Sequence, residues 1–202
     1  ELNSDDHENG TTHWYYANSK GEITIPTADG EVGVVKTIDG KSYLFNSDGE
    51  MVTGLRILTY DGSKITNISS GVDSVDTVKN MNSDTMKLVY FESNGAAKTG
   101  TTTITLDGTS YTFSFKSNGS PRGVGETGIS DGYIYQNGLR LTADEDTKYG
   151  VVTYKNESYL VNEKGSIQKN KKNLKDADET YYCTNAKGIL LHSSTEKCTT
   201  KH

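Results

Sequence analysis

Hydrophobic positions in this chain alternate over short stretches, and turn residues interrupt them at regular intervals. A large aromatic or β-branched pair is followed by a few Asn, Ser, Asp or Lys residues and then by Gly, as in the segment from Tyr43 to Gly49. A weaker copy ends at Gly71, which makes eight units of about 24 residues. The turn glycines of the seven clear copies are Gly21, Gly49, Gly95, Gly119, Gly138, Gly165 and Gly188.

A second class of turn lies between the units and carries Asp-Gly, as in Asp39-Gly40 and Asp107-Gly108. Asp-Gly between alternating segments is a strong type I′ hairpin signal, because both turn residues need positive φ. Each unit therefore holds two turns and two short strands, and no stretch has a helical apolar period. The pattern predicts an all-β fold, an elongated solenoid of tandem β-hairpin repeats with little or no helix, in which each hairpin covers its neighbour.

The repeats also predict the domain organisation. Residues 1–12 are expected to be a flexible N-terminal segment, 13–191 the hairpin array and 192–202 a C-terminal tail. An irregular unit is expected at about 55–86, where the repeat is least clear.

The composition disfavours nucleic-acid binding and membrane insertion as functions of this chain. The chain has 202 residues, 21 Gly, 2 Pro and 13 Tyr, so tyrosine supplies much of the expected core. A formal charge of −6 disfavours nucleic acid as a partner, and no apolar run is long enough for membrane insertion. The segment Lys169 to Lys175 is interpreted as a solvated loop rather than a basic binding patch.

The segment from Thr37 to Gly54 resembles the cell-wall-binding repeat of Gram-positive surface proteins. The shared form is an Asp-Gly turn, an aromatic pair, a polar turn closed by Gly and a Thr-Gly ending, which recurs at Thr99-Gly100. Trp14-Tyr15-Tyr16 resembles the Trp-Tyr-Tyr that opens such repeats. Related repeats form choline-binding modules, the glucan-binding domains of glucansucrases and the carbohydrate-binding tails of clostridial toxins. The resemblance covers roughly residues 13 to 191.

The aromatic positions of the repeats are the candidate ligand-binding residues. Choline-binding members of the family surround a quaternary ammonium with Trp and Tyr, but Trp14 is the one tryptophan here, which disfavours choline. The repeat aromatics either form the solenoid core or stack on sugars from grooves between hairpins. They are Trp14, Tyr16, Tyr43, Phe45, Tyr90, Phe91, Tyr111, Phe113, Tyr133, Tyr135, Tyr159 and Tyr182.

Catalytic and metal chemistry find little support in the sequence. Residues 14–191 contain no histidine, so a His-activated nucleophile is not expected there. His7 beside Asp5 and Asp6 is interpreted as part of a flexible acidic terminus, and the run from Asp144 to Asp146 as a solvated turn. No catalytic residue, metal site or cofactor is therefore predicted, and the chain is not expected to be an enzyme.

The two cysteines, Cys183 and Cys198, either close a loop as a disulfide or remain unpaired thiols.

The leading hypothesis is a non-catalytic repeat module of an exported bacterial protein. It would lie at the cell surface or cell wall and bind cell-wall or glucan-type polysaccharide through several weak sites. The alternative is a structural spacer or an adhesin-like surface that contacts another protein without binding glycan.

Overall fold

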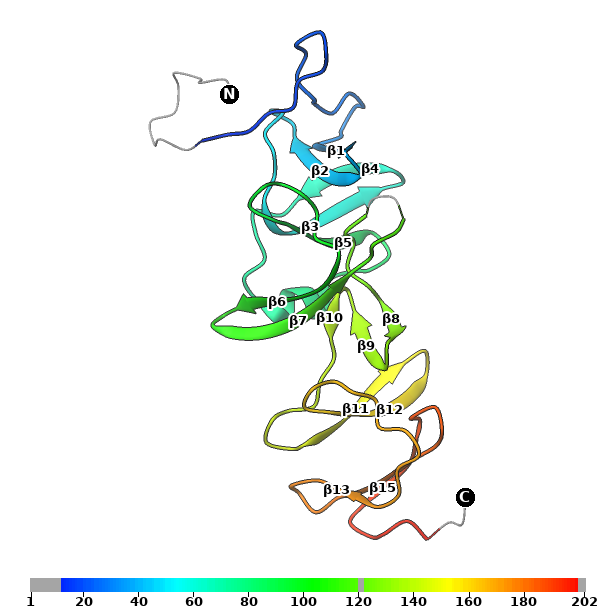
Figure 1. The fold of residues 1–202 in the computed structure, drawn as a ribbon. Helices are drawn as coiled ribbons and strands as arrows, with labels where there is room; N and C mark the ends of the chain where they lie inside the picture. Colours follow the sequence, from blue (N-terminus) through cyan, green and yellow to red (C-terminus); the bar gives the residue numbers. More distant parts are fainter. Residues whose placement is uncertain (1–11, 120–121, 200–202) are drawn as a thin grey trace. The chain divides into compact units, whose positions relative to one another are not determined.

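The computed structural model describes residues 12–119 and 122–199 (Figure 1). The chain divides into two compact units, an N-terminal unit up to Glu126 and a C-terminal unit from Thr127. The predicted flexible segment 1–12 lies outside the described residues except for Thr12, as do His7, Asp5 and Asp6 and the last residues of the predicted tail.

The N-terminal unit is built from antiparallel hairpins. Five of its strands form one sheet in the order β2-β1-β4-β3-β5, and β6 pairs with β7. Its elements are β1 (Gly33–Ile38), β2 (Lys41–Asn46), β3 (Gly54–Asp61), β4 (Lys64–Ile68), α1 (Val75–Asn80), β5 (Met86–Phe91), β6 (Gly100–Leu106) and β7 (Thr109–Phe115).

The C-terminal unit is also antiparallel throughout. Its strands pair as β10-β9-β8, β11-β12 and β13-β14-β15. They are β8 (Gly128–Ser130), β9 (Tyr133–Gln136), β10 (Leu139–Arg140), β11 (Tyr149–Tyr154), β12 (Glu157–Asn162), β13 (Leu174–Lys175), β14 (Tyr181–Thr184) and β15 (Leu190–Ser194). The predicted all-β class of hairpin repeats with little helix is confirmed. The predicted boundary between array and tail falls inside β15.

The turns between units have the expected mirror-image geometry. Asp39 and Gly40 have φ of 49° and 76°, and they connect Ile38 to its cross-strand partner Lys41. Two positive φ values in a two-residue loop define the type I′ turn, whose twist matches that of the strands. Asp107-Gly108, Asp131-Gly132, Asn137-Gly138 and Lys155-Asn156 have the same signs of φ.

The polar turns of the repeats share one hydrogen-bond pattern. The side-chain oxygen of Asn46 accepts from the backbone N–H of Asp48 at 3.0 Å and of Glu50 at 2.8 Å. Gly49 donates its N–H to the Asn46 carbonyl at 3.0 Å. An Asn side chain of this length satisfies the backbone donors that the reversing chain leaves unpaired. Equivalent turns begin at Asn18, Asn162 and Asn185.

Successive hairpins are joined by a backbone hydrogen bond that recurs at one position. The N–H two residues after a turn glycine donates to a carbonyl of the preceding hairpin, as Ala97 does to Ser42 at 2.8 Å. That carbonyl lies seven residues before its own turn glycine, or six in the shortened unit that ends at Gly138. The other three bonds run from Met51 to Trp14, Gly125 to Leu88 and Ile167 to Gly132.

The turn glycines are contact points of this stack. The side chain two residues after one turn packs on the glycine of the next, so that a Cβ at Gly95 would overlap the Met51 thioether. A Cβ at Gly165 would lie 2.9 Å from the Arg140 side chain. Glycine is needed for space as well as for its positive φ at these two positions. The other contacts of this kind are Ile23 on Gly49, Ala97 on Gly123 and Ile167 on Gly188.

Two of the eight predicted repeat units are not formed in the structure as the sequence pattern predicts. Gly71 lacks the positive φ of the other turns, and the residues before it belong to β4, so this weak copy is not a repeat. In the unit after Gly95, the glycine that contacts the neighbouring hairpin is Gly123, which lies against Ala97. A Cβ at the predicted turn glycine, Gly119, would have nothing within 4 Å. The hairpin β3-β4 and the short helix α1, capped by the Ser74 side chain, fill the irregular segment. Because Ala97 bonds directly to Ser42, this segment is an insertion in the stack.

Both faces of the repeat strands are buried, which the alternation alone did not predict. Phe45 is 2% exposed, and its neighbour Leu44 is 0% exposed although it points to the opposite face. A core cluster in the N-terminal unit contains Leu44, Leu58, Ile65, Val89 and Phe91. A second cluster, in the C-terminal unit, contains Ile134, Val161 and Ile167.

Candidate functional site

The predicted aromatic residues differ widely in exposure. Trp14 has 57% of its surface exposed and is the one repeat aromatic that is largely open to solvent. The buried rings are Phe45, Phe91, Phe113, Tyr135 and Tyr182. The half-buried rings are Tyr16, Tyr43, Tyr90, Tyr111, Tyr133 and Tyr159.

Some of these rings lie close to one another inside the stack. Tyr16 and Phe45 have ring centroids 6.3 Å apart, and Tyr133 and Tyr135 lie 6.4 Å apart. Such distances are typical of packed aromatic pairs, so most repeat aromatics contribute to the core.

The pair of Tyr133 and Tyr135 already holds a cation of the chain itself. The Arg140 guanidinium lies 3.8 Å from the Tyr133 centroid and 5.7 Å from that of Tyr135. Arg140 also donates a hydrogen bond to the Tyr135 hydroxyl at 3.1 Å, and its side chain packs on Gly165. A guanidinium in this position occupies the aromatic surface that an external quaternary ammonium would need.

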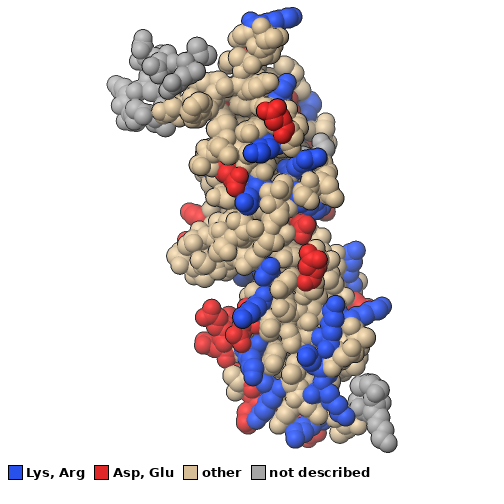
Figure 2. Space-filling view, viewed as in Figure 1, with Lys and Arg blue, Asp and Glu red and all other residues tan. Residues whose placement is uncertain are grey.

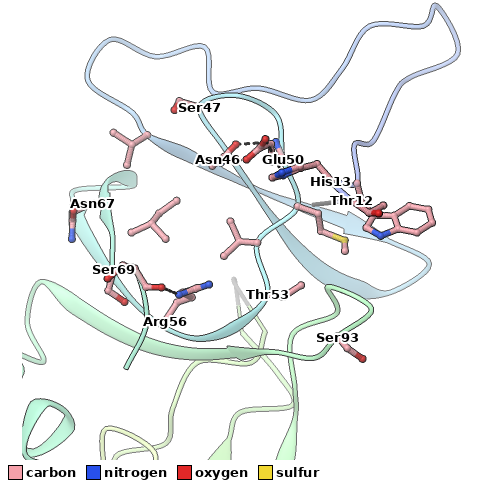
Figure 3. A pocket seen from close by; sticks show the side chains of 16 residues that line it. Thr12, His13, Asn46, Ser47, Glu50, Thr53, Arg56, Asn67, Ser69 and Ser93 are labelled. Atoms are coloured by element: carbon pink, nitrogen blue, oxygen red, sulfur yellow. Dashed lines mark hydrogen bonds and ion pairs between the residues drawn. The ribbon is translucent and has the colours of Figure 1, made fainter. Parts of the chain in front are cut away.

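A groove of about 760 Å³ opens in the N-terminal unit next to the exposed tryptophan (Figure 3). Most of its polar lining consists of hydroxyl and amide side chains, which suit hydrogen bonds to neutral polyols. The lining residues are Thr12, His13, Trp14, Val32, Asn46, Ser47, Glu50, Met51, Val52, Thr53, Arg56, Asn67, Ile68, Ser69, Ser70 and Ser93.

One wall of the groove is organised around Glu50. Its carboxylate lies 2.9 Å from His13 Nδ1 and accepts a hydrogen bond from the Asn46 side chain at 3.1 Å. Asn46 is the residue that shapes the polar turn, so the fold of the repeat also fixes the carboxylate. Figure 3 shows Asn46, Glu50 and His13 together on this wall.

Arg56 and Ser69 lie together on another side of the groove (Figure 3). Arg56 lies in β3 and donates to the Ser70 carbonyl, while its Nε is buried without a hydrogen-bond partner among the described residues. Burial lowers the pKa of Arg56. The guanidinium is therefore a poorly satisfied donor beside the Ser69 hydroxyl.

Trp14 is held at the groove by its backbone. Its carbonyl accepts the stacking hydrogen bond from the Met51 N–H at 2.8 Å. The backbone of Trp14 is thus fixed next to the Asn46 turn, and its indole is exposed. An exposed aromatic face next to hydroxyl and amide groups can stack on the C–H face of a sugar.

Among the described residues that line the groove, Glu50 is the one carboxylate, whereas glycoside hydrolysis uses a facing pair. In residues 12–119 and 122–199, no group of three or more His, Cys, Asp or Glu side chains is arranged to hold a metal ion. No helix of that part of the chain is long and apolar enough to cross a membrane.

The structure joins Cys183 and Cys198 in a disulfide, with Cα atoms 6.6 Å apart. Cys183 lies in β14, and Cys198 follows β15. The Cys198 N–H also donates to the Asn173 side chain at 2.7 Å. Residues after β15 are therefore attached to the sheet.

Sequence reasoning did not find Arg56, Ser69, Glu50 or Arg140. Arg56 could have been noticed as a single cation inside the otherwise apolar run of β3. The contact of Glu50 with His13 joins different repeats, whereas Arg140 lies opposite Tyr135 within the β9-β10 hairpin, and the repeat pattern carries no signal for either contact.

Hairpins stacked through their turns define the fold as an all-β hairpin repeat. No family model matches the sequence, and no curated protein matches it significantly. The chain has the fold of solved choline-binding proteins of Streptococcus pneumoniae. CbpJ shares a TM-score of 0.51 and 19% identity, over 94% of this chain and 47% of that one.

Choline binding protein F shares a TM-score of 0.50 and 21% identity, over 89% of this chain and 44% of that one. A further structure of that protein was determined in the presence of a peptidoglycan analogue, a tetrasaccharide-pentapeptide, and is 22% identical with a TM-score of 0.50. That match covers 89% of this chain and 44% of the protein's length. This chain spans less than half the length of these proteins.

Proposed function

We propose that this chain is a non-catalytic module that binds cell-wall or glucan-type polysaccharide, as part of an exported bacterial protein at the cell surface. The observation that carries the proposal is the exposed Trp14 beside a groove lined by hydroxyl and amide side chains. The fold supports it, because a solved protein of the same fold was studied with a peptidoglycan analogue.

The binding site would combine stacking with hydrogen bonding. Trp14 would cover the apolar face of a sugar ring, while Asn67, Ser69 and Ser93 exchange hydrogen bonds with its hydroxyls. Choline is not the expected ligand, because Arg140 occupies the aromatic pair of Tyr133 and Tyr135.

The test is retention on insoluble polysaccharide. The chain and its Trp14→Ala variant are incubated with purified Gram-positive cell wall, cross-linked dextran, starch and a choline resin, and the bound fraction is measured. We expect retention on wall or glucan, a weakening of about tenfold for Trp14→Ala, and no retention on choline. A tenfold change corresponds to about 1.4 kcal/mol, within the range for a truncated tryptophan anchor.

Two controls make the outcome specific. Leu191→Ala removes another exposed apolar side chain, 44% exposed in β15, and is expected to bind like the unmodified chain. Trp14→Phe keeps an aromatic face and is expected to restore part of the binding. Failure of the unmodified chain on every polysaccharide would overturn the proposal and favour a spacer or protein-contact role. Release of soluble sugar during incubation would contradict the non-catalytic assignment.

A further inference from the structure

The two units differ in charge. Residues 127–202 contain 11 Lys and Arg and 10 Asp and Glu, whereas residues 1–126 contain 10 and 17. Within the C-terminal unit, residues 164–175 contain five Lys and no acidic residue. Figure 2 shows basic side chains gathered over the region of β11 to β15. We call six exposed lysines of this region the lysine face: Lys169, Lys171, Lys172, Lys175, Lys187 and Lys197.

Backbone contacts hold the loop that carries the first lysines. The Lys171 N–H donates to the Thr184 hydroxyl at 3.0 Å, and the Thr184 N–H donates to the Lys171 carbonyl at 2.9 Å. The stem of Lys169 lies against the turn at Gly188, where a Cβ would be 3.5 Å from its Cγ. Lys187 belongs to that same turn. The loop and the turn therefore present their ammonium groups from neighbouring positions.

Lys175 and Lys197 lie at one tyrosine ring. The ammonium groups of Lys175 and Lys197 lie 5.6 Å and 5.8 Å from the centroid of Tyr181. The Cys183–Cys198 disulfide brings Lys197 to this place by fixing the residue next to it. Lysines from the 169–172 loop, the turn at Gly188 and the two segments at Tyr181 thus lie along the β13-β14-β15 sheet.

Most of this charge is not neutralised within the protein. Lys175 pairs with Glu179 at 2.6 Å. In the described part of the chain, no carboxylate lies within 4.0 Å of the ammonium groups of the other five lysines. Like charges held together without counter-charges repel, and binding an anion relieves that repulsion.

The residue types of the lysine face favour phosphate groups and disfavour single-stranded nucleic acid as ligands. Its cations are lysines, which act as point charges toward phosphate, whereas Arg140 is engaged with two tyrosines. The rings of Tyr149, Tyr154 and Tyr181 each have a lysine ammonium within 5.8 Å. Rings covered in this way do not offer the open stacking faces that single-stranded nucleic acids use.

In place of the solvated loop expected at Lys169 to Lys175, we infer a lysine face that binds a linear polyanion, a polymer of polyol units joined by phosphodiesters. Such a polymer carries one charge per unit on a flexible chain, so it can follow ammonium groups that come from different segments. The cation–π position of the Lys175 and Lys197 ammonium groups at Tyr181 reduces the side-chain freedom that is lost on binding. This site is separate from the groove at Trp14.

The test uses the full chain and poly(glycerol phosphate) as probe, with affinity measured calorimetrically at 50 and 300 mM salt. The test variant replaces three lysines of the face by glutamine, Lys171→Gln, Lys172→Gln and Lys197→Gln. The matched control replaces three exposed lysines of the N-terminal unit, Lys20→Gln, Lys41→Gln and Lys116→Gln, with the same change in net charge.

We expect binding at 50 mM salt that is largely lost at 300 mM, and at least tenfold weaker binding by the test variant. Loss of three phosphate contacts is expected to reduce the slope of log K against log salt by about 2, at roughly 0.7 per contact. The control is expected to change affinity less than threefold, and Trp14→Ala is expected to leave it unchanged. Melting curves of both triple variants verify that they remain folded.

Three results would overturn the inference. The first is no binding at 50 mM salt, and the second is equal weakening by the two triple variants, which would indicate net charge alone. The third is tighter binding of single-stranded DNA of equal charge, which would assign the face to nucleic acid. None of these results bears on retention of the chain by neutral polysaccharide, so the two proposals fail separately.

Discussion

The glycine at a repeat turn makes the same left-handed turn as the glycine between units, but only the first is a stacking contact. Gly95 has φ of 80°, and a Cβ there would overlap the side chain of Met51. Gly40 has φ of 76°, with nothing within 4 Å of the same position. Gly40→Ala and Gly95→Ala therefore both force alanine into the left-handed region. Only Gly95→Ala also places a methyl group against the neighbouring hairpin.

The expected magnitudes follow from that difference. An alanine in the left-handed region costs about 1–2 kcal/mol, which is the full expected loss for Gly40→Ala. Gly95→Ala adds the displacement of Met51 in a packed site, for which overpacking costs about 1–3 kcal/mol more. Because Met51 is also joined through its N–H to Trp14, we expect the displacement to loosen the contacts of its hairpin with both neighbouring hairpins.

The assay is urea unfolding followed by tryptophan fluorescence and circular dichroism. Trp14 is the one tryptophan of the chain and lies in the N-terminal unit with all three substituted positions, so its signal reports that unit. A double variant, Gly95→Ala with Met51→Ala, makes room for the new methyl group. We expect it to be more stable than the sum of the two single losses by about 1–2 kcal/mol, the coupling of contacting residues.

Equal losses of stability for Gly40→Ala and Gly95→Ala would refute the reasoning, because the stacking contact would then contribute nothing. Additive effects of Gly95→Ala and Met51→Ala would refute it as well. Either result would mean that the turn glycines are required only for their backbone angle.

Three further predictions concern single groups. The Tyr60 hydroxyl is buried without a hydrogen-bond partner among the described residues, so Tyr60→Phe is expected to stabilise the chain by about 1 kcal/mol in urea unfolding. Burial raises the pKa of Tyr60 from 10.0 to about 12, so its contribution is complete below pH 10 and falls by up to about 1.4 kcal/mol per pH unit between pH 10 and 12. Tyr60→Phe should flatten this alkaline loss, and an unchanged pH profile would contradict the assignment. Asn162→Ala removes the side-chain oxygen that accepts hydrogen bonds from the backbone N–H groups of Lys164 and Ser166. We expect a loss of about 1–2 kcal/mol, with Asn162→Asp close to the unmodified chain, as thermal melts would show. Opening the Cys183–Cys198 loop of about 15 residues by reduction or by Cys198→Ser is expected to cost about 3 kcal/mol in the C-terminal unit, and no shift of its melting temperature would count against a stabilising disulfide.

Local turn chemistry was predictable from the sequence. Asp39-Gly40 and Asp107-Gly108 form the mirror-image turns that their residue types require, and the hairpins around them follow from strand alternation. These features depend on residues that are close in the chain, which is why a pattern along the chain detects them.

Features that depend on contacts between hairpins were not predictable in this way. Gly119 and Gly123 are both glycines in one loop, and only the packing of Ala97 distinguishes the stacked one. The contact of His13 with Glu50 likewise joins different repeats. Of the aromatic candidates, exposure singles out Trp14, and exposure is a property of the assembled stack.

The hydrogen bond that joins successive hairpins has a consequence for how such proteins change over time. It links backbone atoms, as between Ala97 and Ser42, so it survives almost any exchange of side chains. Apart from glycine at the turn, few positions are then constrained in kind. A repeat can be gained, lost or interrupted by an insertion such as 54–86 while its neighbours keep their register. Two chains can therefore have this fold with as little as 19% sequence identity, as this chain and CbpJ do.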